Sequence, residues 1–249
     1  MGVDRTVVTR FGRRLAAAAI SALLLLSAAG CLYPQQHTPG NDVSVRSAVA
    51  SVQQAVQRYQ EATGLLPIIS ADASVPEYEK FKIDFAKMKR AGYIDQVPKI
   101  AFESGGIYIF LMINEETSPV VKLLDVVVHQ AITDVQKNVN AYRDKNGGAI
   151  PAGAELYPGF YDLDFNKLGT ARPDLRSMYS QRPLELMVDE DGRVYGDYGS
   201  DIYAAMNKLP EGAEKPEDLR RLLVEASDYV PVKAPVYVEV DGSPQATIS

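Results

Sequence analysis

Few side chains in this sequence could support covalent or metal chemistry. The chain has one cysteine, Cys31, and two histidines, His37 and His129. No histidine pair stands at H-x-x-x-H spacing and there is no second cysteine, so an ordinary zinc site cannot be assembled. No serine lies in a G-x-S-x-G turn, and a serine triad would depend on His129 as its base. We therefore predict a non-enzymatic protein with no catalytic residue, no metal site and no cofactor.

Cys31 is the residue whose surroundings predict a modification. It follows an uncharged run of 16 residues, 15–30, which has leucine at each position of 23–26 and small residues just before the cysteine. This run is preceded by Arg5, Arg10, Arg13 and Arg14. A basic start, an apolar middle and a small-residue end are typical of a signal peptide. The run is shorter than the roughly 20 apolar residues that span a bilayer.

The end of the run, Leu26-Ser27-Ala28-Ala29-Gly30-Cys31, resembles the lipobox of bacterial lipoproteins, although Ala28 stands where the common pattern has leucine. In that family the cysteine thiol receives a diacylglycerol and a peptidase cuts before it. The resemblance implies a signal peptide at 1–30 and a lipidated Cys31 at the start of a tether, 31–42. It places the rest of the chain on the extracytoplasmic face of the cell membrane. The alternatives are an uncleaved anchor and an ordinary signal peptide with an incidental cysteine.

The part that follows residue 30 is acidic. The chain has 26 basic and 32 acidic residues; four arginines and one aspartate lie before residue 31, which leaves 22 against 31, a formal charge of −9. Phosphate backbones are bound by basic side chains, so nucleic acid is not an expected partner. Anionic lipid headgroups would also repel this part, so the membrane contact is expected through the lipid alone.

A repeat with a period of 83 residues predicts how the rest of the chain is organised. Apolar residues at helical spacing recur in two copies: Val45, Val49, Val52, Val56 and Tyr59, then Val128, Ile132, Val135, Val139 and Tyr142. Such spacing places each set on one face of a helix. Each helix is followed by glycine and then proline, at Gly64 and Pro67 and at Gly147 and Pro151, which favours a helix end.

A second pair of matching blocks follows each expected helix. Residues 83–88 and 163–168 share the pattern apolar, Asp, Phe, any residue, Lys, apolar. We interpret Asp84 and Asp164 as caps of short helices; the alternative is a pair of acids that bind a ligand. Strands are then expected at 106–113 and 120–124 in the first copy, and at 184–188 and 193–196 in the second.

These patterns predict an α+β fold of two tandem repeats, each a helix, a short helix and an antiparallel hairpin. The expected boundaries are 43–125 for the first repeat, 126–209 for the second and 210–249 for a C-terminal extension. Toward the C-terminus we expect helices at 201–209 and 216–226, the second starting at Pro216, and a strand at 236–242.

Two further resemblances concern the folded part. The order of helix, tyrosine, glycine and proline in each repeat resembles the globular heads of type IV pilins and pseudopilins. Over most of the part after residue 30 the sequence is similar to a family of lipoproteins from spore-forming, low-GC Gram-positive bacteria, and residues 101–108, Ala-Phe-Glu-Ser-Gly-Gly-Ile-Tyr, carry this similarity best. Members of that family are sometimes labelled as periplasmic binding components of ABC transporters, receptors that usually have two α/β lobes.

Three features are candidates for contact with a ligand or partner. In Glu103-Ser104-Gly105-Gly106 the glycines could free backbone N–H groups to hold an anion or a partner's carbonyl; the alternative is a turn into the next strand. Acidic residues at 189, 191, 197 and 201 suggest Ca²⁺ or a solvated hairpin turn. The tyrosines, 14 in number with no tryptophan, suit protein contact or half-buried packing.

We therefore expect a lipid-anchored, non-enzymatic module that binds another envelope protein. A solute-binding lipoprotein of an ABC transporter is the alternative, and an enzyme with an unrecognised site is a third hypothesis.

Overall fold

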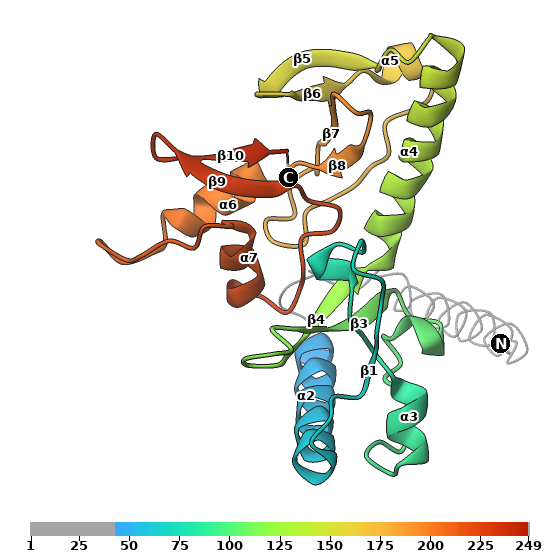
Figure 1. Cartoon of the computed structure of the whole chain (residues 1–249), viewed down its shortest axis with the longest axis vertical. Coiled ribbons are helices and arrows are strands. Elements are labelled where there is room, and N and C mark those ends of the chain that lie inside the picture. The colour runs from blue at the N-terminus through green and yellow to red at the C-terminus, as the bar shows by residue number, and fades with distance from the viewer. Residues whose placement is uncertain (1–42, 249) are drawn as a thin grey trace, which may run out of the picture. The chain divides into compact units, whose positions relative to one another are not determined.

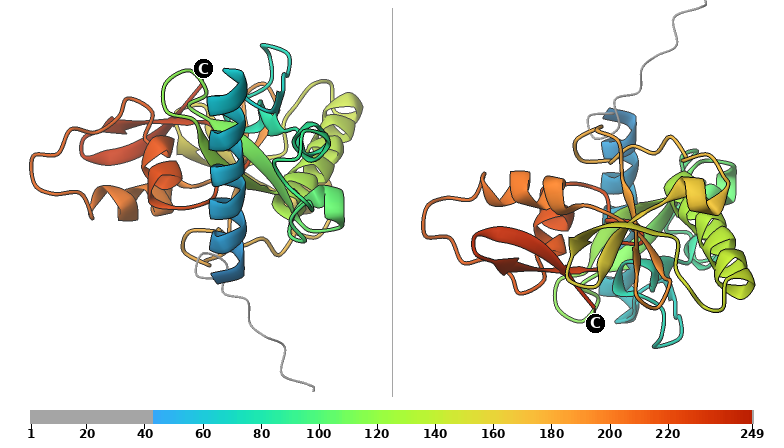
Figure 2. Two further views of the ribbon diagram at one scale, coloured as in Figure 1. Left: turned by 90° about the horizontal axis from the view of Figure 1, so that it is seen from below. Right: turned by 90° about the horizontal axis from the view of Figure 1, so that it is seen from above.

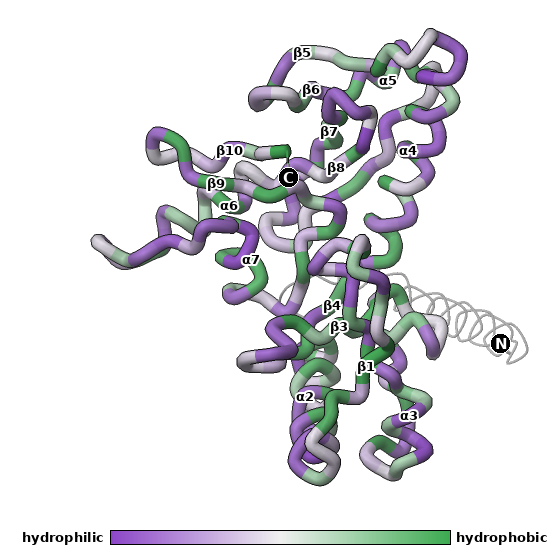
Figure 3. The backbone as a smooth tube through the Cα atoms, in the orientation of Figure 1, coloured by the Kyte–Doolittle hydropathy of each residue, from purple (hydrophilic) through white to green (hydrophobic). Residues whose placement is uncertain are grey.

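Two long amphipathic helices carry the apolar faces expected from the sequence. The computed structural model describes residues 43–248 (Figure 1), in which these helices are α2 (Val43–Thr63) and α4 (Val126–Lys145). All five apolar residues of the first stripe are buried, and four of the second; Tyr142 is half-exposed. Figure 3 shows hydrophobic and hydrophilic bands alternating along both helices. The expectations for residues 1–42, including Cys31, lie outside the described residues.

The same order of elements occurs after each long helix. After α2 come β1 (Ile68–Ile69), the 3₁₀ turn η2 (Glu77–Glu79), β2 (Lys82–Ile83), α3 (Phe85–Arg90), the 3₁₀ turn η3 (Phe102–Ser104), β3 (Tyr108–Ile113) and β4 (Val120–Asp125). After α4 come β5 (Ala152–Tyr157), β6 (Phe160–Leu163), α5 (Phe165–Leu168), β7 (Leu186–Asp189) and β8 (Val194–Gly196). The α+β fold class is confirmed.

Each copy forms a four-stranded antiparallel sheet, with strand orders β1-β2-β3-β4 and β5-β6-β7-β8. The sequence predicted a two-stranded hairpin in each copy, and this was wrong because each sheet has two further strands. Strands β1 and β2 have two residues each, too short for an alternating pattern, and β5 is mostly exposed with register shifts. The two copies do not share one sheet.

The short helices begin as predicted. The Asp84 side chain accepts from the Lys87 N–H at 2.8 Å, and Asp164 accepts from the N–H groups of Asn166 and Lys167 at 3.0 and 3.2 Å. These bonds satisfy N–H groups that a helix start leaves without a partner. Both aspartates are therefore N-caps rather than a pair of acids that bind a ligand.

Strand β3 is buried on both faces because it separates two apolar cores. Phe110 and Met112 pack with the buried face of α2, whereas Leu111 and Ile113 pack with α4 and the second sheet. Figure 2 shows α2 lying against the sheet that contains β3 and β4. Since side chains alternate across a strand, one strand supplies both cores, and the two copies are packed together through it.

The C-terminal part contains α6 (Gly199–Met206), α7 (Arg220–Ala226), β9 (Val236–Val240) and β10 (Ser243–Thr247). Helix α7 begins four residues after Pro216, so the predicted start was wrong; the Asp218 side chain accepts from the Arg220 N–H at 3.0 Å where the helix begins. The sequence predicted a single strand here, whereas the structure has an antiparallel hairpin of β9 and β10.

The segment between α7 and β9 closes the outer edges of both sheets. The Leu123 N–H in β4 donates to the Asp228 carbonyl at 2.8 Å, and the Val230 N–H donates to the Leu123 carbonyl at 3.0 Å. Further along, the Lys233 carbonyl accepts from the Gly196 N–H in β8 at 3.1 Å. The C-terminal part thus connects the last strand of one copy to the last strand of the other.

Candidate functional site

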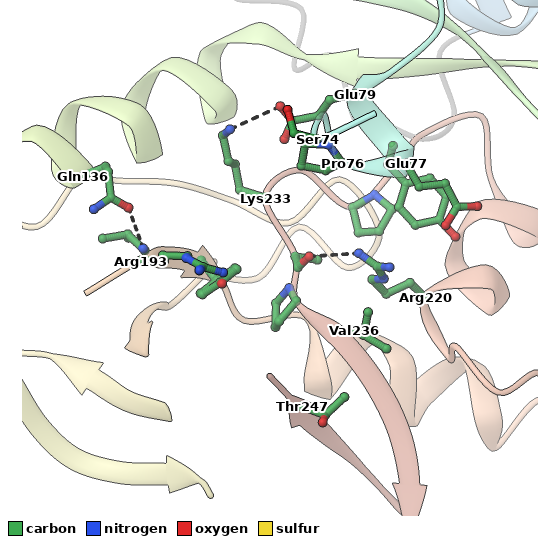
Figure 4. Close-up of a pocket in the computed structure, with 16 residues that line it drawn as sticks. Ser74, Pro76, Glu77, Glu79, Gln136, Arg193, Arg220, Lys233, Val236 and Thr247 are labelled. Atoms are coloured by element: carbon green, nitrogen blue, oxygen red, sulfur yellow. Dashed lines mark hydrogen bonds and ion pairs between the residues drawn. The ribbon is translucent and has the colours of Figure 1, made fainter. Parts of the chain in front are cut away.

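The candidate site is an open cleft where both copies and the C-terminal part meet. We call it the junction cleft; it has a volume of about 480 Å³. It is lined from η2 and the preceding turn, from α4, from β8 and from the C-terminal part (Figure 4): Ser74, Pro76, Glu77, Tyr78, Glu79, Gln136, Arg193, Val194, Tyr195, Arg220, Pro231, Lys233, Ala234, Pro235, Val236 and Thr247.

One wall is fixed by Gln136 on α4. Its side-chain amide donates to the Gly192 carbonyl at 2.7 Å, and its side-chain oxygen accepts from the Val194 N–H at 2.7 Å. The residue between these two, Arg193, extends into solvent with 60% of its side chain exposed. Its Nη2 lies 3.6 Å from Asp191 Oδ2, a loose and exposed contact. The guanidinium also shares a side-chain hydrogen bond with Tyr195, which helps to raise its pKa. Because a guanidinium has five N–H donors and this one is exposed, it can still donate to an incoming group.

Glu79 and Lys233 line a second wall of the cleft and form an ion cluster with His129 on α4. The three residues come from the first copy, the C-terminal part and the second copy. One Glu79 oxygen, Oε2, lies 3.1 Å from His129 Nε2 and 3.2 Å from Lys233 Nζ. Burial acts to raise the pKa of Glu79, but the hydrogen bond from His129 and the charge of Lys233 outweigh it, so the pKa lies below its ordinary value. Lys233 reaches this position with a left-handed backbone, φ 52°.

The third cation, Arg220, is held in place by its neighbours. Its Nε and Nη2 donate to the Asp218 carboxylate at 2.6–3.0 Å, and Nη1 donates to the Ala234 carbonyl at 3.0 Å. The guanidinium lies 4.9 Å from the centre of the Tyr78 ring, a cation–π contact. Burial raises the pKa of Tyr78, which keeps its hydroxyl neutral. Arg220 therefore stabilises the cleft rather than offering a free charge.

The arrangement is suited to binding a charged group. Arg193 offers donors to a carboxylate or phosphate group, and Lys233 can exchange its partner Glu79 for one. The histidine beside the cleft faces Glu79, with no nucleophilic side chain in the same contact. Within residues 43–248, no group of three or more His, Cys, Asp or Glu residues is placed to hold a metal ion.

The predicted loop Glu103–Gly106 does not offer a free amide cradle. The N–H groups of Ser104 and Gly106 donate to the Ala101 carbonyl at 2.9 Å, and that of Gly105 donates to the Phe102 carbonyl at 3.0 Å. These donors are occupied, so binding of an anion by the backbone here is not supported. Glu103 and Ser104 are exposed, and contact with a partner through them stays a prediction.

The acidic residues near the β7–β8 turn do not form a calcium site. Asp189 is buried and accepts from the Arg193 N–H at 2.8 Å and from the Tyr195 hydroxyl at 3.1 Å. Asp197 instead accepts from the hydroxyls of Tyr157 and Tyr237, at 3.0 and 2.8 Å, and so attaches the β9–β10 hairpin to the second copy. The hairpin turn was predicted correctly, although its first acid is buried and not solvated.

Most of the clustered tyrosines and phenylalanines pack inside. Tyr198 and Phe160 are fully buried, and Tyr157, Tyr161 and Tyr195 are partly buried; of the clusters singled out in the sequence, Tyr203 is the exposed member. The half-buried interpretation therefore holds.

The junction cleft itself was missed by the sequence patterns. Its lining residues lie between positions 74 and 247, and no local motif connects them. The partial signal was Arg193, a basic residue in an acidic turn.

The first copy matches a known protein family. Residues 45–125, about a third of the chain, match the YphF family N-terminal domain. No curated protein and no solved structure matches the chain. In residues 43–248 there is no helix long and apolar enough to cross a membrane. The match fits the resemblance to a family from spore-forming bacteria, and it ends at Asp125, where β4 gives way to α4. The first copy of this fold is thus similar to the YphF family N-terminal domain.

Proposed function

We propose that this chain is an extracytoplasmic lipoprotein, held on the cell membrane through acylated Cys31, whose folded part is a non-enzymatic module that binds another envelope protein. The anchor is supported by the sole cysteine at the end of an apolar leader. Two or more acyl chains hold a protein firmly on a bilayer, and the proline-containing segment 31–42 would serve as the tether.

We assign the partner contact to the junction cleft. The observation that carries this assignment is the exposed guanidinium of Arg193 in a cleft lined by both copies and the C-terminal part. Because the part after residue 30 carries a formal charge of −9, an acidic partner segment would be repelled over most of the surface. It would be attracted to the cleft that Arg193 and Lys233 both line, which favours one orientation of the partner.

We also infer that the two copies descend from one duplicated unit. The support is the 83-residue period together with corresponding contacts. The Asp84 N–H donates to the Pro67 carbonyl at 2.8 Å, and the Asp164 N–H donates to the Pro151 carbonyl at 2.9 Å.

The anchor is tested by labelling cells with radioactive palmitate and partitioning the lysate in Triton X-114. The wild-type chain is expected to carry label and enter the detergent phase, and Cys31→Ala is expected to carry none. Label retained by Cys31→Ala would show that the anchor is not this thiol.

The partner is tested by crosslinking in intact cells, followed by mass spectrometry. Wild type is compared with Arg193→Gln and with Arg90→Gln, which removes an exposed arginine outside the cleft. We expect a defined envelope protein to be captured by wild type and Arg90→Gln, and at least fivefold less by Arg193→Gln. Equal capture by both variants would remove the contact from the cleft, and no capture above the Cys31→Ala background would refute a membrane-bound protein partner.

A further inference from the structure

A second cavity, separate from the junction cleft, lies between α6 and α7. Its volume is about 610 Å³. The apolar part of its wall includes Met178, Ala205, Leu209, Leu222 and Leu223. Among the polar groups in the wall is Asp201, in the first turn of α6. A ligand-sized cavity with a largely apolar wall and few polar groups is the usual form of a small-molecule site.

Asp201 is a buried carboxylate with an incomplete set of partners. The residue is 6% exposed, and its Oδ2 accepts from the Ser177 hydroxyl at 2.6 Å. The Ser177 oxygen accepts in turn from the Tyr179 N–H at 3.1 Å, which fixes the hydroxyl in place. Among the residues that the structure describes, no other hydrogen bond or ion pair to the Asp201 carboxylate is present. Its second oxygen, Oδ1, has no protein partner in this part of the chain, and it is not among the fully enclosed side-chain atoms that lack a hydrogen bond, so it is accessible at the cavity wall.

The other buried acids in the described part are better satisfied. Asp125 accepts from two backbone N–H groups at the start of α4, both at Oδ1. Asp189 accepts from the Arg193 N–H and the Tyr195 hydroxyl. A buried carboxylate costs free energy unless it is paired or hydrogen-bonded. The open position at Asp201 is accessible from the cavity, so a cation bound there can pair with it directly.

The surroundings of Asp201 favour a cation over an anion. Tyr179 lies in the same wall, and its hydroxyl donates to the Tyr229 carbonyl at 3.3 Å. Burial raises the pKa of Tyr179, and the charge of Asp201 raises it further, so the hydroxyl stays neutral. Glu225 is a second carboxylate in the wall, where it lies 3.9 Å from Arg221, and Lys208 is a lysine in the same wall.

We propose that the α6–α7 cavity binds a small organic cation, a primary ammonium group carried on an apolar chain. The ammonium donates to Asp201 Oδ1, while the chain lies against Leu222 and Leu223. A hydrogen bond to a charged group contributes more than one between neutral groups, so the carboxylate determines the class of ligand. This proposal does not depend on the lipid anchor or on the junction cleft.

The test is isothermal titration calorimetry on the full chain in a neutral detergent, with the detergent blank subtracted. Three probes of equal length are compared: n-butylammonium, butan-1-ol and butyrate. We expect saturable binding of the ammonium at least tenfold tighter than the alcohol, and no binding of butyrate. Butyrate that binds as tightly as the ammonium, or an ammonium with no saturable binding, would overturn the proposal.

Two variants distinguish recognition of the ligand's charge by Asp201 from the space that the cavity offers its apolar chain. Asp201→Asn keeps an oxygen for the Ser177 hydroxyl and is expected to reduce ammonium affinity at least tenfold, to the level of the alcohol. Asp191→Asn, an exposed acid outside the cavity, is expected to leave affinity unchanged. Ala204→Leu, at an exposed position in the wall, is expected to abolish binding of both probes without altering Asp201. This last variant keeps the test valid if Asp201→Asn fails to fold. Undiminished binding in a folded Asp201→Asn or Ala204→Leu chain would refute the assignment.

Discussion

Gln53 and Gln136 stand 83 residues apart and make the same pair of hydrogen bonds. Gln53 donates to the Pro119 carbonyl at 3.1 Å and accepts from the Val121 N–H at 2.7 Å. Gln136 makes the corresponding bonds, described above, to the backbone of β8. Each glutamine projects from a long helix onto the outer edge of the last strand in its sheet. Each therefore satisfies backbone groups that sheet pairing leaves open.

Replacing either glutamine by leucine is expected to destabilise the fold by about 1–3 kcal/mol, because two backbone groups lose their partners. Urea unfolding followed by circular dichroism measures this cost. Gln54→Leu, at an exposed position on the same helix, is the matched control and should change stability by less than about 0.5 kcal/mol. A similar loss in all three variants would mean that the bonds contribute nothing specific.

The capping role of Asp84 predicts a loss of about 1 kcal/mol in Asp84→Ala, because the Lys87 N–H is left without an acceptor. Asp84→Asn should recover most of that loss, since an amide oxygen can also accept this bond. Thermal unfolding of both variants, with exposed Asp95→Ala as reference, gives the comparison. An alanine variant as stable as the wild type would argue against the cap.

The lowered pKa of Glu79 predicts a stability that falls in acid. The folded pKa lies below the ordinary value of 4.5, so the contribution is fully present above pH 4.5 and is lost as the pH falls through the folded pKa. We expect Glu79→Gln to be less stable than wild type at pH 7 and to approach it toward pH 3. The measurement is the free energy of unfolding in urea at each pH.

The matched control for Glu79 is Glu77→Gln, an exposed acid two residues away. It should show the same stability difference from wild type at pH 7 and pH 3. A Glu79→Gln difference that does not depend on pH would contradict the role of the ion cluster.

The two glycines of the predicted contact loop are expected to respond differently to alanine. A Cβ at Gly106 would lie 2.1 Å from the Ile100 carbonyl oxygen, so Gly106→Ala must displace backbone and should cost about 3 kcal/mol. Gly105 has φ 83° with open space around its Cα, so Gly105→Ala should cost about 1 kcal/mol through backbone strain. Chemical denaturation distinguishes the two; equal costs would refute the close approach at Gly106.

Partner contact through this loop is better tested at its exposed side chains. Glu103→Gln leaves the backbone unaltered, and Ser104→Ala removes only a long, exposed hydrogen bond of 3.4 Å to the Val97 carbonyl. A reduced capture in the crosslinking experiment, by variants whose thermal unfolding matches that of the wild type, would therefore report contact and not folding. Unchanged capture by both would remove the loop from the interface.

Periodicity predicted the two long helices because each buries one face along its length, and β-propensity predicted the longer strands. The stripe from Val45 to Tyr59 repeats at helical spacing, and β3 and β4 are strongly β-prone, so these elements were found. Strands β1 and β2 were missed, since two residues cannot show alternation. Strand β10 contains Pro244, which weakens a strand pattern, although β9 pairs with it over five residues.

The candidate sites escaped prediction for a different reason. Glu79 and Lys233 are 154 residues apart, and their contact depends on how β8 and the C-terminal part pair. Asp201 was singled out as one of several acids, but its burial and its bond to Ser177 could not be read from neighbouring residues. Non-local packing, rather than local propensity, creates both cavities.

The C-terminal segment that covers both sheet edges is synthesised after the strands that it covers. Ribosomes make the chain from its N-terminus, so β4 exists well before its edge partners at Asp228 and Val230 are synthesised. An uncovered strand edge can pair with another chain and aggregate. During that interval Gln53 can already occupy part of the β4 edge, because its partners Pro119 and Val121 are made early. In each sheet a glutamine from the preceding long helix thus covers part of the last strand's edge without any contribution from the C-terminal segment.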